Sequence, residues 1–194
     1  MKKTEITLVI ITSILFILRF IWGVPVNLML RVSLTILSVF YLWTGFFLFN
    51  KLSFRHVHIK QAFKGIDAFK IASGIGMGVV YSVSLISIMY AINIYSGMNF
   101  MLGFSLFCLL TSLSFYAVYY FINHKSFAYV RQFFIRSIIL ITICASLLSI
   151  SVDKRLDILY GEYPEFIQAY KNHNNNPEDS IAAEKLKEER SKFR

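Results

Sequence analysis

Two arginines, Arg19 and Arg31, are the residues of the amino-terminal region whose type and position could do chemistry, because each interrupts a long apolar run. A charged side chain at such a position is costly in lipid and is a functional hypothesis by default. The two could bind an anionic headgroup or substrate at the outer end of these runs. The alternative, which we favour, is that both snorkel to the interface and pair with acids of the carboxyl-terminal tail, namely Asp153, Asp157, Glu162 or Glu165.

A glycine-rich segment, Gly74-Ile75-Gly76-Met77-Gly78, raises the question of a phosphate-binding loop. It lacks the preceding strand and the following Lys or Ser/Thr of such a loop. Gly74, Gly78 and Ser82 instead recur every four residues, which predicts a ridge of small side chains that lets another helix approach closely. We expect that helix within the same chain, although the ridge also permits a dimer.

The histidines and cysteines do not form a recognisable metal site. His56, His58 and His124 lie near the ends of apolar runs, and a His-x-His pair can hold a metal, but no acid or cysteine accompanies them. Cys108 and Cys144 lie inside apolar runs and are predicted to be small buried hydrophobic residues. We therefore predict no catalytic residue, no metal and no cofactor.

The elements that position these residues must be helices in lipid, because the composition does not suit water. Of the 194 residues, 56% are hydrophobic and 16% are charged, whereas soluble domains are about 25% charged. About 20 apolar helical residues cross a bilayer core. The predicted fold is all-α, a polytopic membrane bundle with about five spans, near residues 5–22, 27–49, 71–94, 99–122 and 133–152.

Two tight turns follow from this assignment. Residues 71–122 contain no charge, and a single helix of that length would reach roughly 78 Å, so the chain must turn once, at Tyr95-Ser96-Gly97-Met98-Asn99. The first two spans are separated by Gly23-Val24-Pro25-Val26-Asn27, where Pro25 ends the helix.

Charge position sets the orientation and argues against nucleic acid as a partner, although the net charge is +9. Residues 1–152 hold twelve basic side chains and two acids, whereas residues 153–194 hold eight and nine. The basic excess lies in the segments that precede span one, join spans two and three, and join spans four and five. The positive-inside rule then predicts a cytoplasmic amino terminus and an extracytoplasmic tail.

The connection between spans two and three is predicted to lie on lipid. Ile59, Phe63, Ile66 and Phe69 fall on one helical face, with charged residues opposite. We expect Lys60, Lys64 and Lys70 to lie on an anionic inner leaflet. A simple elbow helix between spans is the more modest version of this prediction.

Span five depends on one basic residue. Arg136 lies in its first turn, and the uncharged stretch that follows, residues 137–152, is only sixteen residues long. Snorkelling of Arg136 to cytoplasmic headgroups would allow the segment to span. If the segment were interfacial instead, the tail would be cytoplasmic.

The tail, residues 153–194, is predicted to be polar and helical or partly mobile. Pro164 lies near the start of a helix over residues 162–172. Pro177 is placed at the first position of a second helix that runs to about Lys192, with Asn176 as its cap. Beyond Asn172 we expect mobility, or order only against a partner.

The chain also matches itself. Asn27-Leu28-Met29-Leu30 recurs as Asn99-Phe100-Met101-Leu102 at an offset of 72, and residues 49–54 recur as residues 122–127 at an offset of 73. The matches mark the start of a hairpin's second helix and its cytoplasmic exit. They predict two parallel repeats, about residues 10–55 and 82–128, plus a fifth span, within a transmembrane domain of residues 1–152.

The turn sequences carry a family resemblance. Trp22-Gly23-Val24-Pro25, with Ile94-Tyr95-Ser96-Gly97 in the second copy, resembles the Trp-Pro-Gly turn of small inner-membrane proteins of gliding bacteria related to the gliding-motor membrane subunit. The resemblance implies a bacterial inner membrane and covers about residues 10–110. No functional residue is carried over, since the motor's membrane carboxylate has no counterpart in these spans.

Three classes of function are left by these patterns. We favour an interaction or assembly subunit, with the bilayer and other membrane proteins as partners, because the spans are rich in packing residues. A small-solute transporter or channel is the alternative, with a polar path formed by Ser84, Ser87, Tyr90, Asn93, Ser105, Thr111, Ser112 and Ser114. An intramembrane enzyme ranks third, because no span contains Asp, Glu or His after Glu5.

Overall fold

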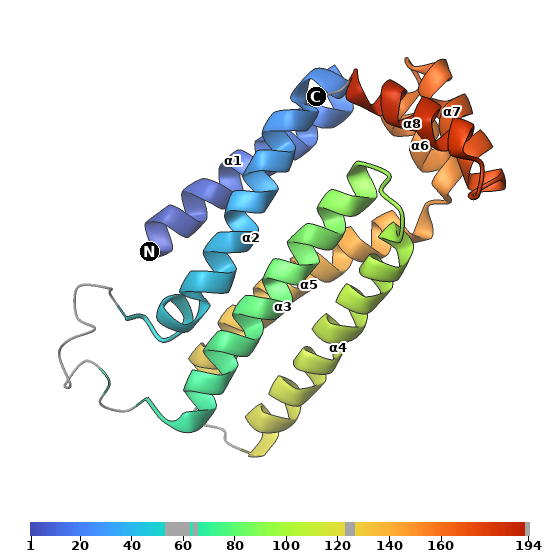
Figure 1. Ribbon diagram of the computed structural model, residues 1–194. Coiled ribbons are helices and arrows are strands. Elements are labelled where there is room, and N and C mark those ends of the chain that lie inside the picture. Colours follow the sequence, from blue (N-terminus) through green and yellow to red (C-terminus); the bar gives the residue numbers. More distant parts are fainter. Residues whose placement is uncertain (53–62, 64–65, 123–126, 193–194) are drawn as a thin grey trace. The chain divides into compact units, whose positions relative to one another are not determined.

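The computed structural model describes residues 1–52, 63, 66–122 and 127–192. Every regular element in these ranges is helical (Figure 1). In chain order they are α1 (Lys2–Trp22), the short 3-10 helix η1 (Val24–Val26), α2 (Asn27–Phe49), α3 (Ala68–Ile92), α4 (Met98–Ile122), α5 (Phe127–Ser149), α6 (Val152–Tyr160), α7 (Pro164–Asn175) and α8 (Ser180–Ser191).

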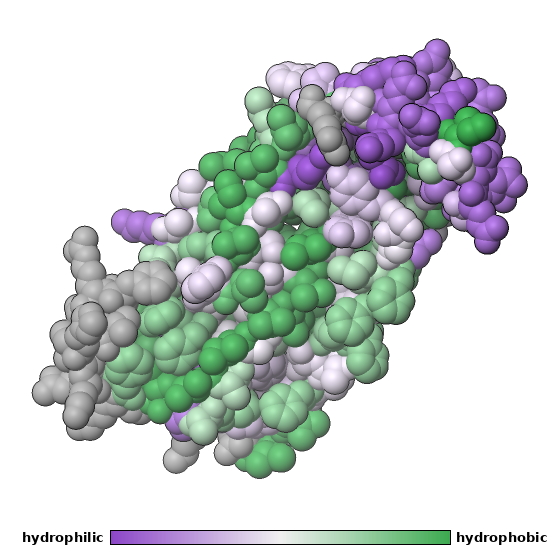
Figure 2. Space-filling model, in the orientation of Figure 1, coloured by the Kyte–Doolittle hydropathy of each residue, from purple (hydrophilic) through white to green (hydrophobic). Residues whose placement is uncertain are grey.

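Five of the described helices are long and apolar enough to cross a bilayer. They are α1, η1 with α2, α3, α4, and residues Tyr129–Ser149 of α5, so the predicted all-α fold with five spans is confirmed. Figure 2 shows apolar residues over the long helices and hydrophilic residues over the tail helices. The chain is therefore a multi-pass membrane protein.

Both tight turns form where the sequence predicts them. α1 ends at Trp22, and Gly23 has φ of 67°, a left-handed conformation that a glycine adopts without strain. Pro25 follows inside η1 and fixes the backbone at the entry to α2. Between α3 and α4, Ile94 and Gly97 both have positive φ, which reverses the chain within a few residues.

The chain divides into two compact units. The bundle unit comprises Met1–Val9 and Leu34–Ser149, and the tail unit comprises Ile10–Ser33 and Ile150–Arg194. In the bundle unit α3, α4 and α5 pack against one another. The predicted internal repeat is not tested by this arrangement and stays a prediction.

Glycines bring α2 and α3 into backbone contact. A Cβ added at Gly78 would lie 2.6 Å from the Tyr41 carbonyl oxygen, and one added at Gly45 would lie 2.7 Å from the Gly78 Cα. Gly74 lies against the backbone of Phe46 in the same way, at 3.0 Å. Since any larger side chain would push these helices apart, the small residues determine how closely α2 and α3 approach.

Hydroxyl groups connect the helices of the bundle unit to one another. Ser38 of α2 and Ser82 of α3 lie 2.7 Å apart, oxygen to oxygen. Ser105 of α4 donates to Ser84 of α3 at 2.7 Å. The Tyr81 hydroxyl donates to the Phe133 carbonyl oxygen of α5 at 2.9 Å. Because lipid offers no competing hydrogen-bond partner, these contacts favour one rotational setting of each helix.

The tail unit differs from the prediction for its second half. α7 runs from Pro164 to Asn175, where the sequence predicts residues 162–172. The next helix begins at Ser180 rather than at Pro177, and its cap is Asp179 rather than Asn176. The Asp179 carboxylate accepts from the Ile181 backbone N–H at 2.9 Å, so it satisfies an amide that Asn176 would not reach. α8 packs against α7, which gives residues beyond Asn172 an internal partner.

Candidate functional site

A buried ion pair in the bundle unit joins the start of α1 to α5. Glu5 is 4% exposed, and its two carboxylate oxygens accept from Arg136 Nε at 2.6 Å and Arg136 Nη2 at 2.8 Å. Two parallel charge-assisted bonds of this kind have the strongest geometry available to a carboxylate and a guanidinium. The pair is thus a fixed, neutral unit inside an apolar bundle.

Side chains from α2 and α5 complete the surroundings of the ion pair. The Tyr41 hydroxyl donates to Glu5 Oε1 at 2.8 Å, and Arg136 Nη1 donates to the backbone carbonyl oxygen of Gln132 at 2.8 Å. The Arg136 guanidinium lies 5.4 Å from the centre of the buried Phe49 ring. A buried pair is favourable only when its remaining donors and acceptors are satisfied, and these contacts supply that condition.

Arg136 is predicted from the sequence to snorkel to the headgroups, and the structure gives it a protein partner instead. Its side chain is 22% exposed, and the Glu5 carboxylate neutralises it inside the bundle. α5 also begins at Phe127, earlier than the predicted start at residue 133. The fifth span is therefore longer than the sixteen uncharged residues suggest.

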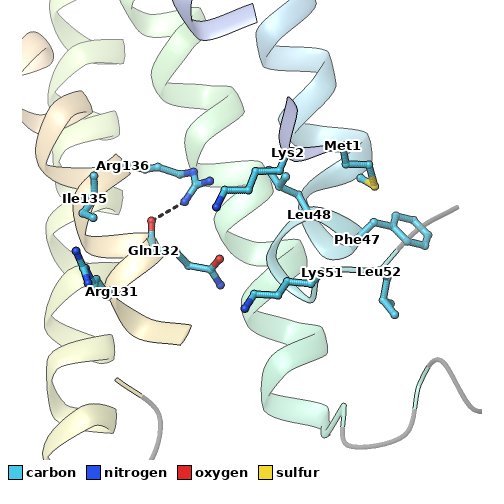
Figure 3. Close-up of a pocket in the computed structure, with 10 residues that line it drawn as sticks. All are labelled: Met1, Lys2, Phe47, Leu48, Lys51, Leu52, Arg131, Gln132, Ile135 and Arg136. Atoms are coloured by element: carbon cyan, nitrogen blue, oxygen red, sulfur yellow. Dashed lines mark hydrogen bonds between the residues drawn. The ribbon is translucent and has the colours of Figure 1, made fainter. Parts of the chain in front are cut away.

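A pocket with a cavity volume of about 870 Å³ lies beside this ion pair. Its lining combines basic and apolar side chains from the start of α1, the end of α2 and the start of α5. The lining residues are Met1, Lys2, Phe47, Leu48, Lys51, Leu52, Arg131, Gln132, Ile135 and Arg136. In Figure 3 Lys2 and Lys51 extend toward α5 while Arg136 extends toward α2, so their charged ends lie between these helices.

The charge of this pocket is one-sided. Lys2, Lys51, Arg131 and Arg136 line it, and none of the described residues that line it is acidic. The Glu5 carboxylate, which lies outside the lining, neutralises the charge of Arg136. The other three basic side chains, Lys2, Lys51 and Arg131, have no acidic residue beside them in the described lining. Within the described part of the chain, no three His, Cys, Asp or Glu residues are grouped so that they could hold a metal ion. The arrangement is suited to binding an anion.

Arg19 lies in the tail unit, where it contacts α6. The residue is 1% exposed, and its guanidinium donates to the Leu159 carbonyl oxygen at 2.8 Å and lies 5.1 Å from the Tyr160 ring centre. These partners are a carbonyl and an aromatic ring rather than the tail acids that the sequence favours. A carbonyl dipole and a ring face both attract a cation, so these contacts stabilise the buried Arg19 side chain.

The other predicted residues are distributed over both units. Arg31 is half-buried at the start of α2, and Lys70 is half-buried near the start of α3. Lys60 and Lys64, with His56, His58 and His124, lie outside the described residues. Gly74, Gly78 and Ser82 line the contact of α3 with α2 that is described above.

Three of the polar side chains offered as a polar path, Ser84, Ser87 and Ser105, bond protein groups. Ser87 donates to the Val83 carbonyl oxygen at 2.8 Å and to the Met101 carbonyl oxygen at 3.0 Å. Ser84 accepts from Ser105 and donates to the Val80 carbonyl oxygen at 2.8 Å. These contacts use the hydroxyl groups to hold α3 against α4.

The pairing of Glu5 with Arg136 and the pocket beside it were not predicted from the sequence. A signal was present, because the predicted threading places both residues near the cytoplasmic end of their spans, at similar depth and with opposite charge. Lys2, Lys51 and Arg131 are assigned to the same side for the same reason. The sequence does not indicate which helices are neighbours, and nothing in it places the start of α1 beside α5.

Comparisons with known proteins identify no relative: no protein-family model matches the chain, and neither does any curated protein or any solved structure. The resemblance to membrane proteins of gliding bacteria therefore stays a prediction that rests on the turn sequences.

Proposed function

We propose that this protein is an interaction subunit of the membrane, a helical bundle that binds other membrane proteins through its lipid-facing surface. The observation that carries the proposal is the division of α4 into two faces. Its inner face, with Leu102, Ser105, Leu109 and Tyr116, is buried in the bundle unit. Its outer face exposes large apolar side chains, namely Phe100, Phe104, Phe107, Leu110, Phe115, Val118, Phe121 and Ile122.

The aromatic content of that outer face supports protein contact. Aliphatic side chains suffice to face lipid tails, whereas phenylalanine rings add preferred pairing geometries with other rings. Aromatic anchors also contribute strongly to protein interfaces. The five exposed phenylalanines of α4 are thus suited to a helix of another protein.

The internal bonding favours this proposal over transport. Ser84, Ser87 and Ser105 hold α3 against α4 through direct hydrogen bonds. A polar path through the bundle would require these groups to face water instead. The transporter or channel hypothesis therefore has less support, and it stays a prediction.

Site-specific photocrosslinking tests the proposal. A photoreactive amino acid is placed at Phe107, which is 67% exposed on α4, and in a matched control at Trp43, which is 75% exposed on α2. Irradiation of intact membranes should give a discrete protein adduct from Phe107 and not from Trp43. Adducts with lipid alone at both positions would contradict an interaction role for α4.

The proposed location is the cytoplasmic membrane of a bacterium, with the amino terminus inside and the tail outside. Support comes from the shared position of Lys2, Lys51 and Arg131 around one pocket, because the positive-inside rule places such a group in the cytoplasm. In a variant without Cys108 and Cys144, a cysteine introduced by Lys171→Cys should react with an impermeant maleimide in intact cells. A cysteine from Lys51→Cys should react only after lysis, and the reverse pattern would invert the topology.

A further inference from the structure

The pocket of the bundle unit combines basic and apolar side chains, and the proposed interaction through α4 does not involve it. Its basic side chains come from three helix ends, so their grouping is a product of the fold and not of one charged segment. Its cavity volume of about 870 Å³ lies within the roughly 300–1,000 Å³ of small-molecule sites. Such a volume accommodates a phosphorylated headgroup together with part of an attached chain.

The cations are suited to a phosphate group. Arg131 and Arg136 each present a planar fork of N–H donors, and Lys2 and Lys51 add mobile point charges. The described bonds of Arg136 use three of its five N–H donors, and Glu5 holds the guanidinium in a fixed orientation. Glu5 therefore acts as a positioning residue for the one pocket cation that is partly buried.

The apolar side chains indicate that the phosphate belongs to a lipid. Phe47, Leu48, Leu52 and Ile135 line the same pocket as the cations. Ile135 is one helical turn deeper along α5 than Arg131, about 6 Å at the usual rise. Arg131 and Lys51 thus lie toward the ends of their helices, where headgroups are, and Phe47, Leu48 and Ile135 lie about one turn deeper, at the depth of Arg136. A free phosphate ion has no apolar group that could contact the apolar side chains of the pocket.

We infer that this pocket binds the phosphate group of an anionic phospholipid, with Lys2, Lys51 and Arg131 on the phosphate, the Glu5-paired Arg136 at its inner edge, and Phe47, Leu48 and Ile135 beside the acyl chains. The site is independent of the proposed interaction surface, because α4 supplies none of the lining residues. Failure of either proposal leaves the other standing.

Lipid retention measured by native mass spectrometry tests the inference on the full chain in detergent. The probes are phosphatidylglycerol, phosphatidylcholine and inorganic phosphate, each titrated separately. The pocket variant is Lys51→Gln with Arg131→Gln, and the matched control is Lys154→Gln with Lys187→Gln, which removes two exposed cations outside the pocket. A third variant, Lys51→Arg with Arg131→Lys, keeps the charge.

The wild type should retain phosphatidylglycerol in preference to phosphatidylcholine. One basic residue near an anionic group usually corresponds to about fivefold in affinity, so the pocket variant should bind phosphatidylglycerol about thirtyfold more weakly. The control and the charge-keeping variant should stay within about threefold of wild type on the same scale. Circular dichroism and gel filtration verify that each variant is folded.

Two other outcomes are informative. If inorganic phosphate binds at the pocket and neither lipid is preferred, the phosphate site stands and its ligand is a soluble phosphate compound, which overturns the assignment to a lipid. If the pocket and control variants lose phosphatidylglycerol equally, or if none is retained selectively by wild type, the whole inference is overturned.

Discussion

Arg136 in the bundle unit and Arg19 in the tail unit both carry a positive charge on a long apolar helix, but their surroundings differ. Arg136 is neutralised by the bidentate Glu5 carboxylate, whereas Arg19 is held by the Leu159 carbonyl oxygen and the Tyr160 ring. The first arrangement removes net charge from the bundle. In the second arrangement no carboxylate of the described residues neutralises Arg19, and its guanidinium instead contacts a carbonyl dipole and an aromatic ring. The comparison indicates that loss of the counter-charge at Arg136 should be the more damaging event.

The largest expected effect follows from Glu5→Gln. The substitution leaves Arg136 with a partly buried charge and no counter-ion; a fully buried one would cost about 3–5 kcal/mol, and we expect a loss toward the lower end of that range. Thermal unfolding in detergent, followed by circular dichroism, measures the loss. The double variant Glu5→Met with Arg136→Met removes both charges and should recover most of the stability. Equal destabilisation by the single and double variants would show that the ion pair is not the reason.

A substitution on α3 tests whether the Arg136 cluster depends on close helix contact. Gly78→Ala places a Cβ against the Tyr41 carbonyl oxygen, and Tyr41 is the residue that donates to Glu5. Overpacking of this kind should destabilise by about 1–3 kcal/mol in the same unfolding assay. The matched control is Gly76→Ala, since no atom lies within 4 Å of a Cβ added there. A control as damaging as Gly78→Ala would contradict a steric cause.

The tail unit should respond less to loss of its cation. Arg19→Met removes the hydrogen bond to Leu159 and the ring contact, but it leaves no opposite charge unpaired. We expect a loss of about 1.5 kcal/mol, seen as faster tryptic release of the tail. Arg19→Lys should not restore protection, because lysine lacks the planar fork. Lys154→Met, which removes an exposed tail cation, serves as the control. Protection unchanged in Arg19→Met would remove Arg19 from the tail contact.

The smallest effect is expected from pH. Burial raises the pKa of the Tyr160 hydroxyl above its usual value of 10, and the nearby Arg19 cation only partly offsets this. The unfolded tyrosine ionises first as pH rises, so the stabilisation is fully present below about pH 10 and is lost above it. Tail release as a function of pH, compared with Tyr160→Phe, measures the change. Identical profiles would argue against a buried hydroxyl.

Local features of the fold could be predicted from sequence because each depends on a few neighbouring residues. Pro25 and Gly23 end a helix through their own backbone preferences, and the uncharged stretch of residues 71–122 must turn somewhere near Gly97. The start of α8 was misplaced because two capping residues, Asn176 and Asp179, were both suitable locally. Contact with α7 was not visible in the sequence.

The candidate site was harder to predict because it depends on helices far apart in sequence. Glu5 and Arg136 could be assigned a similar depth, yet depth does not determine which helices are neighbours. The same holds for Arg19, whose expected partners were acids. The Leu159 carbonyl and the Tyr160 ring carry no net charge. A search of the sequence for oppositely charged residues therefore could not identify them as the contacts of Arg19.

The position of the ion pair along the chain has a consequence for biosynthesis. Glu5 and Arg136 are 131 residues apart, so at about 5–20 residues per second the ribosome needs roughly 7–26 s to deliver the second partner after the first. Until then the carboxylate has no counter-charge at its final depth. A chain that stops before α5 therefore has the Tyr41 hydroxyl but not the Arg136 guanidinium available to Glu5.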